Sequence, residues 1–327
     1  MWHPKGLAWP TAARCATFCC ALTACDAPAD QACEDEAAEG GPKADSIDGE
    51  PDDAASVRPP LVRFVDNSRF EVGVESSPRP LPTVLQADRA TIDSALASFV
   101  DDIAFADYPF SGCHDRAHVT YAHLARTLGT ERVAKVWVFS SRLMTVALPG
   151  QIESPVDEAR WGAPTTTWDY HVAAVVRGPD GLLVVDPVLA DPTSPLTLDE
   201  WFGHMTLSPG SVYTLADGEL YSFNVADAGL FANGRTPFHG AMFEYSGFAR
   251  SDRWLEKDLA RDAVGVALSE RVGECPELRV NLLEPQLLYD ALEGMRFGNF
   301  VSNECAPYFD RYLAELAAWS NTVDALQ

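Results

Sequence analysis

Apolar residues recur at helical spacing on either side of a break in the chain. Residues 91–105 carry them three and four positions apart, which predicts a helix with Thr91 as its N-cap. Pro109 and Gly112 then interrupt the pattern, and a second helix is predicted to follow and to stop at Gly129. The apolar faces are formed by Ile92, Ala95, Leu96, Phe99 and Ile103, and by Ala117, Tyr121, Leu124 and Leu128.

β-Prone runs separated by turn residues predict the strands. The runs cover residues 61–74, 133–138, 170–177 and 182–186, and a long loop rich in Pro, Thr and Gly is expected at 148–167. The last two runs flank Gly178-Pro179-Asp180-Gly181, which is typical of a hairpin. A turn centred midway between positions 171 and 186 would place His171 directly opposite Asp186, with Cβ atoms about 5 Å apart.

The chain becomes mainly helical after about residue 250. Candidate helices lie at 252–272, 284–297 and 307–326. Cys275 and Cys305 flank one of these helices and could form a disulfide in an oxidising compartment. Strands and helices together predict an α+β fold, with a principal domain at 59–240 and a helical C-terminal extension at 241–327.

The first 25 residues have the composition of an export signal. Lys5 and Arg14 occur without any acidic residue, and a short apolar run ends in Leu22-Thr23-Ala24 before Cys25. Small residues at this place suit a lipoprotein signal peptidase, after which Cys25 would carry lipid. We therefore expect an exported bacterial protein, either a cell-envelope lipoprotein or a secreted protein. An ordinary signal peptide or a misassigned start codon would be the alternative.

Residues 26–58 are predicted to be an acidic, disordered tether. They hold no aromatic residue and only Ile47 and Val57 as large aliphatic residues, so little can offset the entropy lost on ordering. The whole chain of 327 residues has a formal net charge of −24. A surface of that sign repels phosphate backbones and anionic lipid, so we expect no nucleic-acid partner and membrane contact only through the lipid anchor.

Cys113 is the first candidate for chemistry. It follows Gly112 at, or one residue before, the predicted start of the second helix. The positive end of the helix dipole favours a thiolate there, and the thiolate is the nucleophilic form of cysteine. A buried structural cysteine at a turn would show the same local pattern.

His171 and Asp186 could supply the base and the group that orients it. A carboxylate bonded to one ring nitrogen fixes the tautomer and leaves the other nitrogen for a thiol. The neighbouring hairpin positions are apolar, so a buried acid there needs a partner. A purely structural His–Asp bond is the alternative, and the sequence leaves open whether Cys113 meets His171.

Three short segments, in this order, resemble the protein-glutaminase family. They are Ser111-Gly112-Cys113 with Arg116-Ala117-His118, then Trp168 to Ala173, then Val185-Asp186-Pro187. The resemblance covers about residues 105–205. It implies a papain- or transglutaminase-like core with the nucleophile Cys113 at a helix N-terminus and with His171 and Asp186 on adjacent antiparallel strands.

The resemblance also implies an activity. The protein would deamidate glutamine side chains of a protein or peptide substrate through a thioester on Cys113, releasing ammonia and requiring no metal or organic cofactor. Trp168 and Tyr170 would line the substrate slot, unless they are core aromatics. A transglutaminase-like acyl transferase or a cysteine peptidase would use the same three catalytic residues, so both stay open.

Two other classes of function remain. His114 and His118 lie four positions apart on the second helix, with Asp115 between them and His123 nearby. This arrangement loosely resembles the zincin motif His-Glu-x-x-His, although Asp is one methylene shorter than Glu and no third ligand is obvious. The other class is a non-catalytic, lipid-anchored binding protein.

Overall fold

The computed structural model describes residues 62–64, 81–103, 105, 108, 110, 112–146, 166–223, 242–271, 273–298 and 302–326. The expected signal peptide with Cys25, the tether at 26–58, most of the run at 61–74 and most of the loop at 148–167 lie outside these residues. The predicted domain boundaries therefore stay predictions. Within the described part, no helix combines the length and the apolar character needed to cross a membrane.

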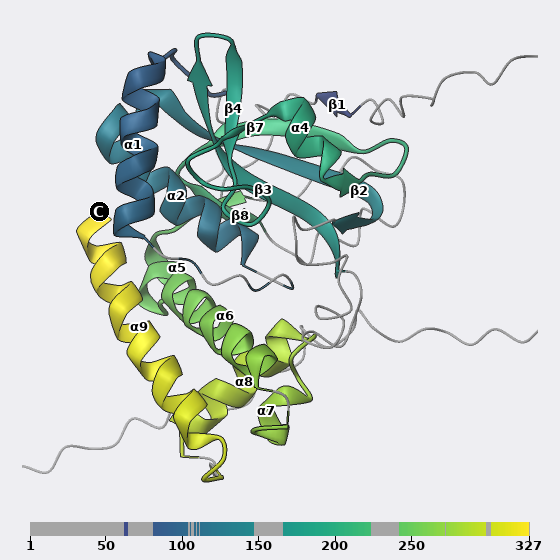
Figure 1. The fold of residues 1–327 in the computed structure, drawn as a ribbon, viewed down its shortest axis with the longest axis vertical. Coiled ribbons are helices and arrows are strands. Elements are labelled where there is room, and N and C mark those ends of the chain that lie inside the picture. The colour runs from purple at the N-terminus through teal and green to yellow at the C-terminus, as the bar shows by residue number, and fades with distance from the viewer. Residues whose placement is uncertain are drawn as a thin grey trace, which may run out of the picture. The chain divides into compact units, whose positions relative to one another are not determined.

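The larger sheet of the described chain carries the hairpin with His171 (Figure 1). Its strands follow the order β1 (Arg63–Phe64), β7 (Val212–Asp217), β2 (Val133–Val146), β3 (Thr166–Gly178), β4 (Gly181–Val185) and β5 (Leu196–Thr197), and β6 (Met205–Thr206) pairs with β2. β1 runs parallel to β7, and the other pairs are antiparallel. A separate pair is formed by β8 (Leu220–Phe223) and β9 (Met242–Glu244).

Two helices pack against this sheet as the apolar spacing predicts. They are α1 (Arg89–Asp102) and α2 (Cys113–Leu128), which ends at Gly129, and a 3-10 turn, η1 (Thr130–Arg132), leads into β2. The predicted N-cap of α1 is wrong by three positions, because Asp88 precedes the helix and its side chain accepts a hydrogen bond from the Thr91 N–H. Both predicted apolar faces are buried.

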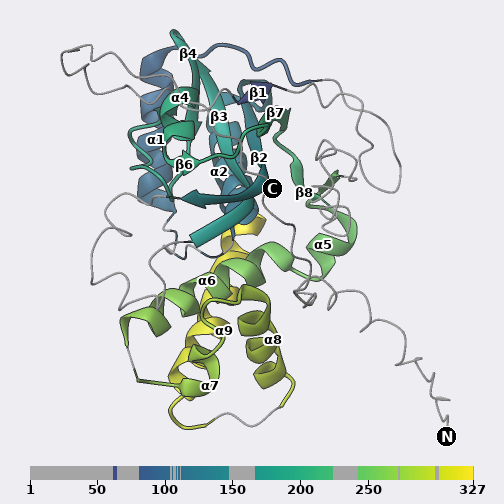
Figure 2. The same cartoon turned by 90° about the vertical axis from the view of Figure 1, so that its right-hand side faces the viewer.

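The C-terminal part forms a helical group with its own core. Its helices are α5 (Gly247–Ser251), α6 (Trp254–Glu270), α7 (Pro276–Arg279), α8 (Pro285–Arg296) and α9 (Ala306–Leu326), so the three long predicted helices are confirmed. Leu268, Leu288 and Tyr312 are among its buried residues. Cys275 and Cys305, whose pairing the sequence leaves open, form a disulfide. α6 packs against α8 and α9, and α2 contacts both β3 and α6 (Figure 2).

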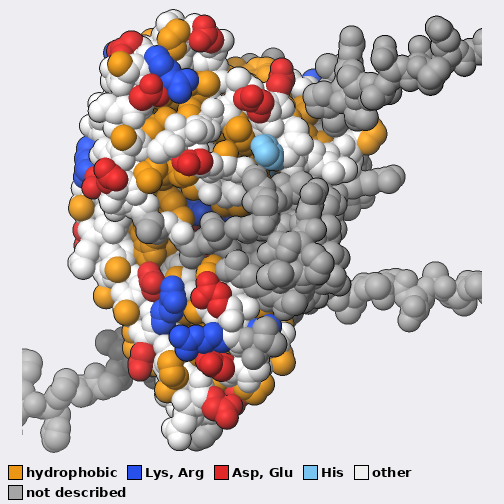
Figure 3. All heavy atoms as spheres, in the orientation of Figure 1, with side chains coloured by type: hydrophobic (Ala, Val, Ile, Leu, Met, Phe, Trp, Pro, Cys, Tyr) orange, Lys and Arg blue, Asp and Glu red, His pale blue; other side chains and the backbone are white. Residues whose placement is uncertain are grey.

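Charges of both signs are mixed on the helical group. On the face drawn in Figure 3, acidic and basic side chains are intermingled there rather than gathered in one patch. Lys257 on α6 and Arg296 on α8 both lie close to Glu293, with N–O distances of 3.4 and 3.3 Å. Glu293 is therefore flanked by two basic side chains.

The predicted hairpin exists, but its register differs from the prediction. Gly178 pairs with Gly181 and Val175 pairs with Val184, so the loop consists of Pro179 and Asp180 alone. Continuing this register places Asp186 level with Ala173 rather than His171. Direct opposition of His171 and Asp186 is thus wrong by two residues. A shift of two keeps both side chains on the same face, where diagonal neighbours are still within reach of each other.

Candidate active site

His171 and Asp186 are in direct contact. His171 Nε2 lies 2.6 Å from Asp186 Oδ2, and both side chains are buried. Asp186 also accepts hydrogen bonds from the Trp201 indole N–H (2.7 Å to Oδ2) and from the Val188 backbone N–H (3.0 Å to Oδ1). Burial alone would raise the pKa of Asp186, but His171 and these donors hold it below its ordinary value.

The second ring nitrogen of His171 has no such partner. Nδ1 is buried and makes no hydrogen bond to any residue in the described ranges. Trp168 and Trp201 stack on the imidazole, with ring centroids 4.4 and 5.4 Å away. The Asp186 bond and the two indoles therefore fix the plane of the ring and leave Nδ1 as its open acceptor or donor.

Cys113 is the first residue of α2 and the free thiol among the described cysteines. Gly112 before it has a φ of 84°, and a Cβ atom at that position would overlap the carboxylate of Asp262, so only glycine fits. The side chain of Cys113 is partly buried and packs against an apolar cluster that includes Val172. The structure thus brings Cys113 to the strand that carries His171.

The surroundings of Cys113 favour the neutral thiol. Burial raises the pKa of Cys113 to about 12, and the carboxylates of Asp115 and Asp186 add to the rise. Arg116 and a hydrogen bond from the Val172 backbone act in the opposite direction. A thiolate at this place therefore needs a positive partner to offset its lost hydration.

The two aromatic residues predicted to line the substrate slot lie on β3 with His171. Trp168 is buried against the imidazole. Tyr170 stacks on Trp137, with ring centroids 5.7 Å apart, and its hydroxyl oxygen lies 3.4 Å from His114 Nδ1. Trp168 therefore supports the imidazole. Contact of either residue with a substrate stays a prediction.

The three histidines of α2 have different polar neighbours, although His114 and His118 both pack against the Tyr221 ring. His118 Nδ1 lies 3.0 Å from Lys135 Nζ, and the ring of His123 packs against Phe99. His114 instead faces Asp115, with 3.4 Å between Nε2 and Oδ2. The groups of three possible ligand residues found in the described part of the chain include His114 but not His118.

Two neighbours of the site escaped prediction. Trp201 follows a capping box between Thr197 and Glu200, and this Thr-x-x-Glu signal could have placed a helix here. Arg116 Nη1 lies 2.9 Å from Asp262 Oδ2, with both side chains buried. Nothing in the sequence indicates the contact between Arg116 and Asp262, because the two residues are far apart along the chain and share no periodic pattern.

Comparison with known proteins finds a family for the segment that contains the three residues. Residues 86–205, just over a third of the chain, match the glutaminase family model. This segment is related to the protein-glutaminase family. It contains Cys113, His171 and Asp186, so the resemblance predicted from the sequence is confirmed. A glutaminase-family domain also indicates an amidohydrolase.

A solved structure is similar to part of the chain. The NMR structure of protein-glutaminase from Chryseobacterium proteolyticum is 22% identical, covers 44% of this chain and 78% of its own, and gives a TM-score of 0.32. The comparison with curated proteins found no match.

Proposed function

We propose that the protein hydrolyses the side-chain carboxamide of glutamine in a protein or peptide, through a thioester on Cys113. The proposal is supported mainly by the buried His171–Asp186 pair. His171 Nδ1 has no hydrogen-bond partner among the described residues, and His171 lies on the strand against which Cys113 packs. The glutaminase relationship of residues 86–205 gives the substrate class. A papain-like arrangement of these three residues is part of the proposal.

Acylation begins with proton transfer from the Cys113 thiol to His171 Nδ1. The thiolate then attacks the carboxamide carbon, while Asp186 stabilises the imidazolium. This transfer creates the positive partner that the buried thiolate requires. As the C–N bond breaks, His171 returns the proton to the nitrogen, ammonia leaves, and a thioester to Cys113 remains.

Deacylation repeats these roles with water. His171 removes a proton from water, which attacks the thioester carbon; the C–S bond breaks, the thiol is restored and glutamate is released. The developing oxyanion needs donors in both steps. Gly112 offers no capping side chain, so the first-turn N–H groups of α2 are available, and we assign the Cys113 N–H to this role.

Ammonia release from a glutamine-rich unfolded protein tests the proposal. Cys113→Ala and His171→Ala should lower kcat/KM to background while the far-UV circular dichroism stays that of the parent. Glutamate should appear at the former glutamine positions by mass spectrometry. A Cys113→Ala protein that liberates ammonia at the parental rate contradicts the assignment.

The same assay separates the rival acyl-transfer reactions. Adding a primary amine distinguishes a transglutaminase, which would incorporate the amine into the substrate and form crosslinks. A cysteine peptidase would shorten the substrate chain. We expect ammonia release with unchanged chain length and little incorporation of amine.

We further propose that the protein is exported as a lipoprotein anchored through Cys25. The small residues before Cys25 support this, as does the disulfide between Cys275 and Cys305, which suits an oxidising compartment. Metabolic labelling with a clickable fatty acid should mark the parent and not Cys25→Ala. Equal labelling of both proteins would contradict the proposed lipid attachment at Cys25.

A further inference from the structure

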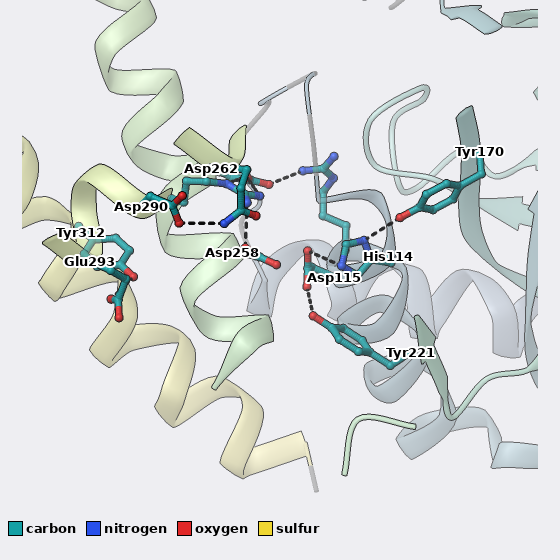
Figure 4. Close-up of polar contacts among 12 residues, drawn as sticks. His114, Asp115, Tyr170, Tyr221, Asp258, Asp262, Asp290, Glu293 and Tyr312 are labelled. Atoms are coloured by element: carbon teal, nitrogen blue, oxygen red, sulfur yellow. Dashed lines mark hydrogen bonds and ion pairs between the residues drawn. The ribbon is translucent and has the colours of Figure 1, made fainter. Parts of the chain in front are cut away.

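A polar cluster joins the start of α2 to α6, outside the His171–Asp186 pair. His114 and Asp115 from α2 meet Asp258 from α6, and one ligand atom from each lies within 4.8 Å of the other two (Figure 4). Asp115 is fully buried, whereas the side chains of His114 and Asp258 keep 18% and 23% of their exposure. The cluster is thus enclosed yet open to solvent at one side.

Asp115 is buried with one oxygen unpaired. Oδ1 accepts the Tyr221 hydroxyl hydrogen, whereas Oδ2 has no hydrogen-bond partner among the residues that the structure describes. The Nε2 of His114 lies 3.4 Å from this oxygen. A fully buried carboxylate oxygen without a partner is costly, so a ligand at this place would stabilise the fold.

The other carboxylates near the cluster are already partly neutralised. Asp258 Oδ1 accepts from the Arg261 guanidinium at 2.8 Å. Asp262 uses both oxygens, accepting from Arg116 at 2.9 Å and from Arg261 at 2.7 Å. Asp258 and Asp262 thus each have an arginine partner, whereas Asp115 Oδ2 has no hydrogen-bond partner among the described residues. A cation at this place would find its open ligand atom there.

His114 is oriented as a metal ligand. Its Nδ1 lies 3.4 Å from the Tyr170 hydroxyl, which can accept the Nδ1 proton and leave the Nε2 lone pair facing Asp115 Oδ2. Ligating histidines are commonly held by such a second hydrogen bond. Two ligands on one tetrahedral ion with bonds of about 2.1 Å are separated by about 3.4 Å, which matches the Nε2–Oδ2 distance.

We propose that His114, Asp115 and Asp258 bind one divalent cation of the zinc type, with water in the fourth position. One imidazole and two carboxylates are ligands that Zn²⁺ accepts. The ion would tie the helix that begins at Cys113 to the C-terminal helical group. It takes no part in the thioester chemistry, so the site is independent of the proposed deamidase function.

Zinc binding to the full chain tests the site. The protein is stripped with EDTA, exchanged into buffer with ZnCl₂ and passed through gel filtration, and its zinc content is measured by plasma mass spectrometry. The Asp258→Asn protein should hold one equivalent of zinc less than the parent protein. His118→Gln, on the same helix but facing Lys135, should hold as much as the parent. A hundredfold excess of Zn²⁺ over Kd should raise the parent Tm by about 5 °C or more.

X-ray absorption then identifies the ligands. In Cys113→Ala, bound zinc should show nitrogen and oxygen neighbours at about 2.0–2.1 Å and a histidine signature, without sulfur at about 2.3 Å. Zinc held by the cysteines of the N-terminal segment would remain in Asp258→Asn and show sulfur. Equal zinc in parent and Asp258→Asn, a spectrum dominated by sulfur, or binding of Mg²⁺ but not Zn²⁺ would each overturn the proposal. If Asp258→Asn is unfolded by circular dichroism, His114→Gln replaces it and must show the same loss.

Discussion

Asp186 holds its neighbours through both carboxylate oxygens. Oδ2 accepts from His171 Nε2–H and from the Trp201 indole N–H, and Oδ1 accepts from the Val188 N–H. Three donors converge on one acidic side chain that is buried. An isosteric amide cannot replace it, because the NH₂ group must face at least one of these donors.

We therefore expect Asp186→Asn to lower kcat/KM by about 10³–10⁴-fold while the protein stays folded. The misplaced NH₂ group would turn the imidazole or reverse its tautomer, so that Nδ1 no longer accepts the thiol proton. Steady-state ammonia release measures the effect. Asp191→Asn, which removes an exposed carboxylate that caps Thr193, is the matched control and should keep the parental kcat/KM. Parental activity in Asp186→Asn would contradict this role.

Where β2 packs against α2, a lysine side chain is buried. Lys135 on β2 is fully buried, and its Nζ donates to the Leu220 carbonyl at 2.7 Å. Burial holds the pKa of Lys135 well below its ordinary value, although Asp217 and Asp115 oppose the shift. Between the folded and unfolded pKa values the unfolded chain binds more protons, so the free energy of unfolding rises with pH in that window.

Replacing Lys135 with Met should remove this pH dependence. As pH rises from 7 to 10, the parent should gain unfolding free energy relative to Lys135→Met, by at most about 1.4 kcal/mol per pH unit. Urea denaturation at several pH values measures the difference, in which other titrating groups cancel. Lys257→Met, which removes a lysine that is ion-paired with Glu293, is the matched control for the loss of a lysine as such. A difference between parent and Lys135→Met that is constant with pH would rule out a neutral buried amine.

Helices and the hairpin could be predicted because their signals are local. Apolar spacing and Gly129 located α2, and the Gly178–Gly181 segment located the turn. The predicted register failed because the sequence marks a turn without fixing its centre. The His171–Asp186 contact survived that error, since a shift of two residues keeps each side chain on its face.

Short elements and long-range contacts were beyond prediction. The strands β5, β6 and β9 span two or three residues each, too few for a period of two to be recognised. The six- and four-residue strands β7 and β8 were missed, although buried and half-buried residues alternate along β7. Their positions depend on pairing with β2, β4 or each other, which only the folded chain supplies. The pair of Arg116 and Asp262 illustrates the same limit, because oppositely charged residues occur throughout this sequence.

At the scale of the whole molecule, the C-terminal helical group contributes to the turn before Cys113. The Asp262 carboxylate fills the space beside Gly112 and bonds Arg116, one turn along α2 from Cys113. This group lies beyond the glutaminase match, which ends at residue 205. The C-terminal helical group, which lies outside the segment related to glutaminases, therefore helps to shape the turn that precedes Cys113.

A double-mutant cycle measures how tightly the two parts are joined. Arg116→Met and Asp262→Leu should each lower the free energy of unfolding by about 3 kcal/mol, because each removes one half of a buried ion pair. The double variant should lose about 1–3 kcal/mol less than the sum of the single losses. Arg89 and Asp93, 2.7 Å apart and exposed, form the control pair, with an expected coupling below about 0.5 kcal/mol. Strict additivity at the buried pair would show that the stability of the fold does not depend on this contact. Strong coupling would show that the C-terminal helices help to hold the start of α2, where Cys113 lies.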